Sequence, residues 1–304
     1  MSRLPTDPAP DGALRERAPA KVNLTLRVLG RRADGYHDLS SLVAFAGTGD
    51  RLALAPGAGL SLALAGPGAA TLAADADNLV LRAARHLAER VPGLLAGRFT
   101  LDKRLPVASG IGGGSADAAA ALRLLARANE LAAGDPRLFE AALATGSDVP
   151  ACLFGRSCLM EGRGEALAPV ALPRFGAVLV NPRLPVATAD VFRALALAPA
   201  TRRAEASPSP SGASRAMLLE WLRAEPNDLE APARRLVPAL DTVEAALATT
   251  PGVLLVRMSG SGATMFALYA DCRAAAAAAR SVAGAHPAWW VKSTVLGGPG
   301  STET

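Results

Sequence analysis

The first third of the chain changes its hydrophobic period several times, and each period predicts an element. Residues 18–29 (APAKVNLTLRVL) alternate apolar and polar side chains, which indicates a half-buried strand. Residues 78–91 repeat apolar side chains at helical spacing and stop at Pro92-Gly93, so a helix is predicted there. FTLDKRLP (99–106) alternates again and predicts a strand that leads into a glycine-rich stretch.

The middle of the chain is predicted to be helical first and extended afterwards. Alanines and leucines after the glycines predict a helix to about Leu131, and a second helix follows over about 136–144. The apolar segment VPACLF after Asp148 is interpreted as a buried strand. CLFGRSCLMEGRGE is typical of a hairpin with Gly155-Arg156 near its turn.

The C-terminal half mixes strands and helices without a regular alternation of the two, which predicts an α+β fold in two lobes. RFGAVLVNP, WWVKSTVL and both flanks of the turn in GVLLVRMSGSGATMFALYA have the character of strands. We expect a disordered tail over 1–17, an N-terminal lobe over 18–166 and a C-terminal lobe over 167–288. Residues 198–214 are poor in large apolar side chains and predict a mobile loop.

Composition and charge exclude several classes of protein. The net charge is +5, but the arginines are scattered and only 4% of the residues are aromatic, so no nucleic-acid surface is indicated. No apolar run is long enough for a transmembrane helix, and the N-terminus lacks the apolar core of a signal peptide. We therefore expect a cytoplasmic protein without a membrane partner. A monomer or weak homodimer is a separate expectation.

The cysteines do not indicate a zinc or redox site. Cys152, Cys158 and Cys272 are an odd, scattered set without a CxxC spacing. Buried free thiols are the expectation.

The stretch Ser109-Gly-Ile-Gly-Gly-Gly-Ser-Ala-Asp117 carries the strongest chemical signal. Glycine is a poor helix former and alanine the best, so a loop ends here in a helix, with Ser115 or Asp117 where capping groups belong. Backbone N–H groups at such a helix start bind phosphate. No lysine follows the glycines, and Ser115 replaces the third glycine of the dinucleotide fingerprint, so neither the P-loop nor that fingerprint fits.

A second glycine turn, MSGSGATMF (258–266), lies between two apolar strands. Taken alone, it is an ordinary hairpin turn. Paired with the first loop, it would close a phosphate channel from the opposite side.

Two charged residues stand among apolar neighbours. An aspartate such as Asp148 is usually an exposed turn residue, but partial desolvation also makes a carboxylate into a catalytic base. Lys21 lies within a predicted strand, where its charge needs a partner. Together they would orient a substrate hydroxyl and stabilise the anion formed on its deprotonation.

The tetrapeptide GYHD (35–38) follows a predicted turn. Tyr36 and His37 are either plain surface residues or a base-binding pair, in which the ring stacks and the imidazole hydrogen-bonds the base edge. No HxxxH motif or carboxylate cluster predicts a metal cage, so any Mg²⁺ is expected to arrive on nucleotide phosphates.

Three of these stretches, in this order, resemble the three motifs of the GHMP kinase superfamily: PAKVNLTLRVLGRRADGYHDL, LPVASGIGGGSADAAAAL and VRMSGSGATMFALY. DNLVLRAARHL, GSDVP and GRGE also fit, so the resemblance spans about Ala18 to Leu296. It implies a ribosomal-S5-like N-terminal lobe, completed by a strand at about 289–297, and a ferredoxin-like C-terminal lobe.

The combination of PAKVNL with GYH implies an ATP-dependent kinase that phosphorylates the 2-hydroxyl of a CDP-linked methylerythritol, in non-mevalonate isoprenoid precursor biosynthesis. Asp148 would take the hydroxyl proton, and Lys21 would hold both the carboxylate and the hydroxyl. The resemblance places ATP at Asn78, Lys103, Pro106, Ser109, Gly110, Ile111, Gly112, Gly113, Gly114 and Ser115. It places the second substrate at Asn23, Tyr36, His37, Thr188, Phe192, Gly260 and Gly262.

Two departures from the family pattern bear on this site. Ser115-Ala116-Asp117 replaces the commoner Ser-Ser-Asp, which removes a hydroxyl that could reach Mg²⁺ or phosphate, and a serine precedes Asp148 where alanine is usual. Two other functions stay open: a GHMP kinase for mevalonate-type or homoserine-type acceptors, and a non-catalytic nucleotide or sugar sensor. An acceptor without a base has no use for Tyr36, and a sensor needs neither Asp148 nor Lys21.

Overall fold

The computed structural model describes residues 12–72, 74, 77–201 and 210–298. The chain forms two compact units, and each is assembled from separated stretches of sequence. The first unit comprises Met1–Ala20, Gly49–Val107 and Gly113–Phe154. The second comprises Lys21–Thr48, Ala108–Gly112 and Gly155–Thr304.

The first unit packs four helices against strands. Its extended segments belong to β1 (Leu14–Asn23), the second half of β3 (His37–Pro56), β4 (Leu60–Ala65) and β5 (Gly97–Asp102). β5 pairs antiparallel with β3 and parallel with β4. The short 3-10 turn η1 (Ala69–Thr71) precedes the helices α1 (Leu79–Ala88), α2 (Gly113–Ala128), α3 (Pro136–Thr145) and α4 (Val149–Phe154).

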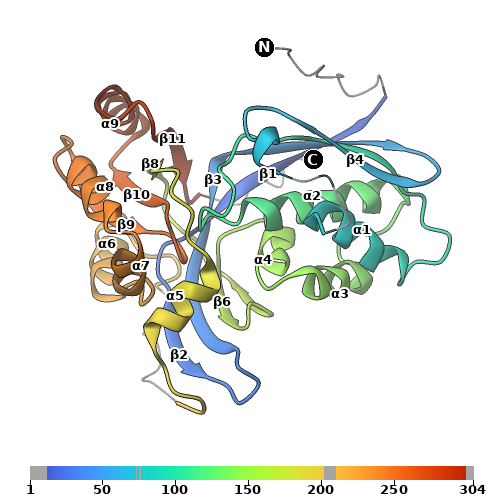
Figure 1. Cartoon of the computed structure of the whole chain (residues 1–304), viewed down its shortest axis with the longest axis horizontal. Helices are drawn as coiled ribbons and strands as arrows, with labels where there is room; N and C mark the ends of the chain where they lie inside the picture. The colour runs from blue at the N-terminus through green and yellow to red at the C-terminus, as the bar shows by residue number, and fades with distance from the viewer. Residues whose placement is uncertain (1–11, 73, 75–76, 202–209, 299–304) are drawn as a thin grey trace. The chain divides into compact units, whose positions relative to one another are not determined.

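The core of the first unit contains large apolar side chains from β3 and β5. Leu52 and Leu54 of β3 lie opposite Leu101 and Phe99 of β5, and all four side chains are buried. Their neighbours Arg51 and Arg98 are exposed on the other face, as alternation in a strand requires. Figure 1 shows the helices α1–α4 gathered on one side of β1 and β4.

The second unit is built on a larger sheet. Its strands run in the order β3, β11 (Trp290–Leu296), β8 (Phe175–Asn181), β10 (Met265–Tyr269) and β9 (Val253–Met258). β2 (Arg27–Arg31) and β6 (Cys158–Gly162) pair with β3, and β7 (Ala166–Pro169) pairs with β6. The helices are α5 (Thr188–Leu195), α6 (Arg215–Ala224), α7 (Glu230–Leu236), α8 (Ala239–Ala248) and α9 (Cys272–Ala285).

Helices α8 and α9 cover this sheet. α9 packs on β8, β10 and β11, and α8 packs on β9 and β10. Every residue of β8 is buried, which explains its unbroken apolar sequence GAVLV. Small side chains such as Ala275 and Ala279 on α9 allow the helix to approach the strands closely, within a core shared with Val178 and Tyr269.

Several sequence-based expectations were wrong. β1 begins at Leu14, so the predicted tail does not reach residue 17; Glu16 in this strand pairs with Arg123 and Arg127. Residues 1–11 of that tail, and 202–209 of the predicted loop, lie outside the described residues. VPACLF forms the helix α4, and Pro150 is compatible with it because proline is tolerated in the first turn of a helix. The hairpin is formed by β6 and β7, so its turn lies at 163–165 and not near Gly155-Arg156.

The second unit also includes a short piece of the first glycine loop. Residues 108–112 belong with the second unit because the backbone N–H of Lys21 donates to Ile111, and that of Thr264 donates to Ser109. β11 pairs along its length with β8 and also pairs with β3, at Leu296 and Ala46, so it lies between these two strands in the sheet.

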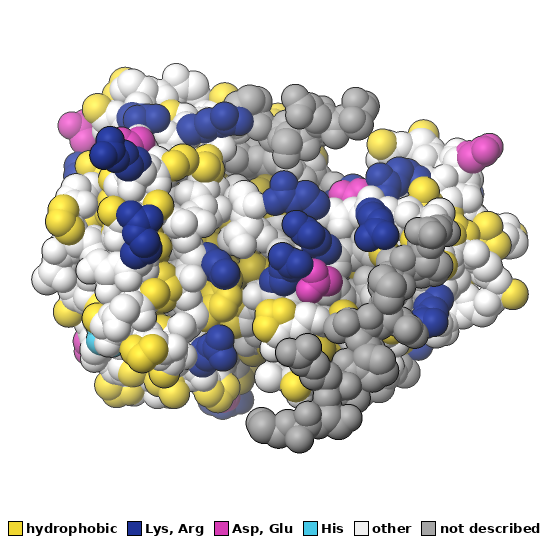
Figure 2. Space-filling view, turned by 90° about the horizontal axis from the view of Figure 1, so that it is seen from above, with side chains coloured by type: hydrophobic (Ala, Val, Ile, Leu, Met, Phe, Trp, Pro, Cys, Tyr) yellow, Lys and Arg dark blue, Asp and Glu magenta, His cyan; other side chains and the backbone are white. Residues whose placement is uncertain are grey.

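On the face drawn in Figure 2, several Lys and Arg side chains lie next to one another near the middle of the view, and others stand singly among hydrophobic and uncharged ones. No helix in the described part of the chain is long and apolar enough to cross a membrane.

Candidate active site

The two glycine turns lie against each other in the second unit. Gly110 has a φ of +74°, and a Cβ added to it would lie 2.6 Å from the carbonyl oxygen of Ser259 and 2.7 Å from the backbone nitrogen of Gly262. The Ser259 hydroxyl donates to the Gly110 carbonyl at 2.9 Å. The contact is therefore backbone on backbone, and it needs a glycine at position 110.

Lys21 and Asn23 reach the same place from β1. The Lys21 side chain is buried, and its Nζ donates to Asn23 Oδ1 at 3.1 Å. Asn23 is fixed in turn, because its backbone N–H donates to Ser259 Oγ and its amide donates to Ser41 Oγ. A Cβ on Gly112 would meet the Lys21 Cβ at 3.1 Å, so the lysine stem lies directly beneath the first glycine loop.

The second glycine turn is held by amide side chains. Asn227 donates through Nδ2 to the carbonyls of Met258 and Gly260. A Cβ on Gly260 would lie 3.1 Å from Asn23 Oδ1. Thr188, at the start of α5, places its hydroxyl 2.9 Å from that of Ser261. The structure thus brings together Lys21, Asn23, Thr188 and the 259–264 turn.

A group of rings lies elsewhere in this unit. The rings of His37 and Phe192 stack with centroids 4.6 Å apart and an interplanar angle of 25°. Burial and the nearby Arg31 lower the pKa of His37, which keeps the imidazole neutral near pH 7 with one donor and one acceptor nitrogen. Tyr36 precedes it and is 49% exposed. These features suit a planar, hydrogen-bonding ligand.

In the first unit, a buried group of charges supports the start of α2. Lys103 Nζ donates to Asp50 Oδ2 and to Asp117 Oδ2, both at 2.6 Å, and all three residues are almost fully buried. Asp50 also accepts the backbone N–H groups of Arg104 and Leu105. Asp117 is therefore not a helix cap: α2 begins at Gly113, and the carboxyl of Asp117 anchors the helix to the sheet.

Residues expected to bind ATP gather around this helix start. A Cβ on Gly113 would lie 3.1 Å from Lys103 Nζ, and one on Gly114 would lie 3.2 Å from Leu79 Cδ1. Asn78, next to Leu79, caps α1 by accepting the N–H of Val80. The Lys103 side chain is 2% exposed, and its bond to Asp117 ties it to α2 inside the unit.

The remaining expected site residues have the following places. Asp148 is half-buried in the first unit, where its carbonyl accepts the N–H of Cys152 in α4. Ser115 is half-buried in the first turn of α2, Pro106 is half-buried after β5, and Ser109 and Ile111 are buried in the glycine loop. Gly262 follows Ser261 in the second glycine turn.

The charge group predicts a pH dependence of stability. Burial and the neighbouring Asp50 outweigh the attraction of Lys103 and raise the pKa of Asp117 to about 7. The folded state then holds a proton more tightly than the unfolded chain, so this stabilisation is complete below about pH 4 and is lost as the pH rises to about 7.

Raising the pH from 5 to 7.5 should therefore lower the free energy of unfolding of the wild type more than that of Asp117→Asn, by roughly 1–3 kcal/mol. Urea titrations of both proteins at the two pH values measure this difference. Parallel changes in the two proteins would contradict a raised pKa at Asp117.

Sequence reasoning missed several residues of these sites. Ser259 and Ser261 lie in a motif that was interpreted through its glycines, and Asp117 was interpreted, as an alternative to Ser115, as a helix cap. Ser41, Asp50 and Asn227 carry no local signal, because their partners lie far away in sequence: 18 residues for Ser41 to Asn23, 53 for Asp50 to Lys103, and 31 for Asn227 to Met258.

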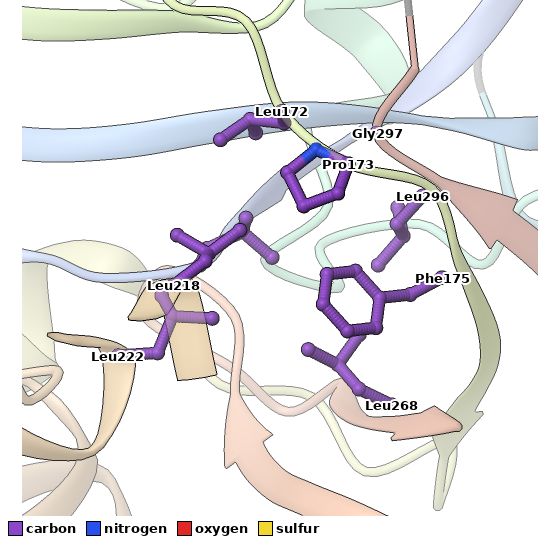
Figure 3. A pocket seen from close by; sticks show the side chains of 9 residues that line it. Leu172, Pro173, Phe175, Leu218, Leu222, Leu268, Leu296 and Gly297 are labelled. Carbon is purple, nitrogen blue, oxygen red and sulfur yellow. The ribbon is translucent and has the colours of Figure 1, made fainter. Parts of the chain in front are cut away.

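Two other features do not form a site for a charged substrate. The pocket in Figure 3 is lined by apolar side chains, among them Phe175, Leu218 and Leu268, so it offers no group to bind a phosphate. Among the described residues, no three His, Cys, Asp or Glu side chains are grouped to hold a metal. Cys152 and Cys158 are buried free thiols as expected, but Cys272 is exposed.

The comparison with known proteins agrees with this geometry. Residues 78–156 match the family model of the GHMP kinases N terminal domain, and residues 204–288 match that of the GHMP kinases C terminal domain. A 4-diphosphocytidyl-2-C-methyl-D-erythritol kinase from a strain of Rhodopseudomonas palustris is 60% identical over 291 residues, which are 93% of this chain and 97% of that protein. The chain belongs to the 4-diphosphocytidyl-2-C-methyl-D-erythritol kinase family of GHMP kinases.

Further matches support this assignment. The kinase of the same name from Xanthobacter autotrophicus is 58% identical and covers 93% of this chain and 99% of its own. A crystal structure of 4-(cytidine 5'-diphospho)-2C-methyl-D-erythritol kinase superimposes with a TM-score of 0.73 at 36% identity, covering 94% of this chain and all of that one. A homoserine kinase from Cytophaga hutchinsonii has a TM-score of 0.70 at 19% identity and covers 98% of both chains, which shows a shared fold.

Proposed function

We propose that this GHMP kinase transfers the γ-phosphoryl group of ATP to the 2-hydroxyl of 4-diphosphocytidyl-2-C-methyl-D-erythritol, giving the 2-phosphate and ADP. The reaction is a step of non-mevalonate isoprenoid precursor biosynthesis. One observation carries the proposal. Ser259 is hydrogen-bonded both to Asn23, the partner of Lys21, and to Gly110, so the Lys21 ammonium belongs to the same hydrogen-bonded network as the glycine loop expected to bind phosphate.

Phosphoryl transfer requires mainly alignment and charge stabilisation, and these residues can supply both. The free backbone N–H groups in the first turn of α2 bind phosphate oxygens of ATP. Lys21, oriented by Asn23, stabilises the negative charge that forms on the acceptor oxygen. Asp148 takes the proton of the 2-hydroxyl, so that the oxygen attacks phosphorus as the bond to ADP breaks.

Mg²⁺ would arrive bound to the phosphates of ATP and would supply charge neutralisation there. Ser115 is the one hydroxyl of the SAD sequence that remains to contact it. The proposal includes a cytoplasmic location and a monomeric or weakly dimeric state. Size-exclusion chromatography with light scattering can test the oligomeric state.

The assay that tests the function measures ADP release from Mg-ATP with the cytidine compound, and with mevalonate and homoserine in parallel. We expect turnover with the cytidine compound only. Turnover with mevalonate or homoserine would favour another GHMP kinase activity, and ATP binding without turnover would favour a nucleotide sensor.

Replacing Tyr36 by alanine should raise KM for the cytidine compound by roughly 5- to 100-fold, because base–aromatic stacking contributes about 1–3 kcal/mol. The kcat and the KM for ATP should stay close to those of the wild type. Steady-state kinetics with each substrate varied in turn measure both effects. An unchanged KM for the cytidine compound would remove the case for stacking at this ring.

A further inference from the structure

Arg163 lies in a tight turn whose residues have no role in the proposed function. The turn joins β6 to β7, and its fold is fixed by two hydrogen bonds: Arg163 N–H donates to Glu165 Oε2 at 2.6 Å, and Gly164 N–H donates to the Glu161 carbonyl at 3.1 Å. Gly162 pairs with Leu39 across β3 and β6. This register brings the turn beside residues 36–38.

The guanidinium of Arg163 lies over the ring of Tyr36, with Cζ 3.8 Å from the ring centroid. This distance is well within the range of a cation–π contact. The backbone of Tyr36 is also held, because Arg32 N–H donates to its carbonyl at 2.7 Å and its own N–H donates to Asp34 Oδ1 at 3.0 Å. The ring is thus fixed through its backbone and through one face.

The neighbouring arginines are engaged differently. Arg32 pairs with Asp34 and Asp38, and Arg31 donates to the Leu197 carbonyl. Arg163 is exposed, and among the described residues its guanidinium has no acidic partner. Its side chain is therefore ordered by the aromatic ring and not by an ion pair.

We propose that Arg163 is a positioning residue for the pyrimidine of the substrate. Its planar guanidinium covers one face of Tyr36 and fixes the orientation of the ring, so the ring offers its uncovered surface to the base without a further loss of side-chain freedom. His37, stacked on Phe192, follows directly in the chain and supplies hydrogen bonds to the edge of the base. This inference rests on the proposed function.

The test is steady-state kinetics of Arg163→Ala together with calorimetric binding of the cytidine compound in the absence of ATP. We expect both KM and Kd for the cytidine compound to rise roughly two- to fivefold, as for an exposed cation–π contact. The kcat and the KM for ATP should change less than about twofold. Arg163→Lys, which keeps the charge and loses the planar group, should give an intermediate loss.

A double-mutant cycle with Tyr36→Ala shows whether Arg163 acts through the ring. In the Tyr36→Ala background, Arg163→Ala should cause no further loss of affinity. Additive losses would overturn the positioning role in favour of a direct contact with the substrate. A KM that falls in Arg163→Ala would also overturn it, because the guanidinium would then occupy the place of the base.

Arg280→Ala on α9 is the matched control, because it removes an exposed arginine and the same charge from another element. It should leave all constants unchanged. The assay of the wild type separates the proposed function from the positioning role of Arg163. If the wild type does not turn over the cytidine compound, the proposed function fails. With turnover and an unaffected Arg163→Ala, only the present inference fails.

Discussion

Replacing Asp148 by asparagine should lower kcat by roughly 10²- to 10⁴-fold, the usual contribution of a positioned general base. Asparagine keeps the size of the side chain and loses the proton acceptor. Since the backbone carbonyl of Asp148 supports α4 through the N–H of Cys152, and this bond is retained, the fold should be unchanged. Single-turnover kinetics at saturating substrates, with circular dichroism as a check of folding, measure the effect.

Glu140→Gln on α3 is the matched control for this variant. It removes the same charge from an exposed carboxylate in the same unit and should keep full activity. If Asp148→Asn retained near-full kcat, Asp148 would be no base, and alignment of the two substrates would suffice for transfer.

Gly110→Ala should be the most damaging change in the glycine loop. The methyl group would come within 2.6–2.7 Å of the backbone of Ser259 and Gly262, and the φ of +74° is unfavourable for alanine. We expect the free energy of unfolding to fall by roughly 2–4 kcal/mol and activity to be lost, because the loop must move away from the 259–264 turn. Urea unfolding and the ADP-release assay report on the two effects.

Gly284→Ala provides the opposite expectation for the same substitution. Gly284 lies in α9 with no atom within 4 Å of an added Cβ, so alanine should stabilise the protein by roughly 0.5–1 kcal/mol and leave activity unchanged. A Gly110→Ala variant as stable as the wild type would contradict the contact between the two glycine turns.

Elements with a strong period were predictable from the sequence. The strand RFGAVLVNP and the helix near 136–144 agree with β8 and α3 to within a few residues. The segment VPACLF failed because six apolar residues have no distinguishing period, and packing on α2 and α3 decided for a helix.

Site residues could be predicted where the signal lies within one short stretch of sequence, and not where a residue's role depends on a partner far away in the sequence. The glycine stretch and Lys21 stand out as a pattern and as an isolated charge. Ser259 does not, since its role depends on Asn23, 236 residues away. The burial of Lys103 between two carboxylates was equally invisible, because Asp50 and Asp117 come from a strand and a helix with no common motif.

The interleaving of the two units constrains how the chain can fold during synthesis. Residues 21–48 leave the ribosome early, yet the strands of their own unit, β8 to β11, are made last. Pairings across such long separations are slow to form, so the early strands must stay unaggregated until translation is nearly finished. Cutting the gene after residue 154 would therefore not yield an autonomous kinase domain, because Lys21 and Asn23 would be parted from the serine that orients them.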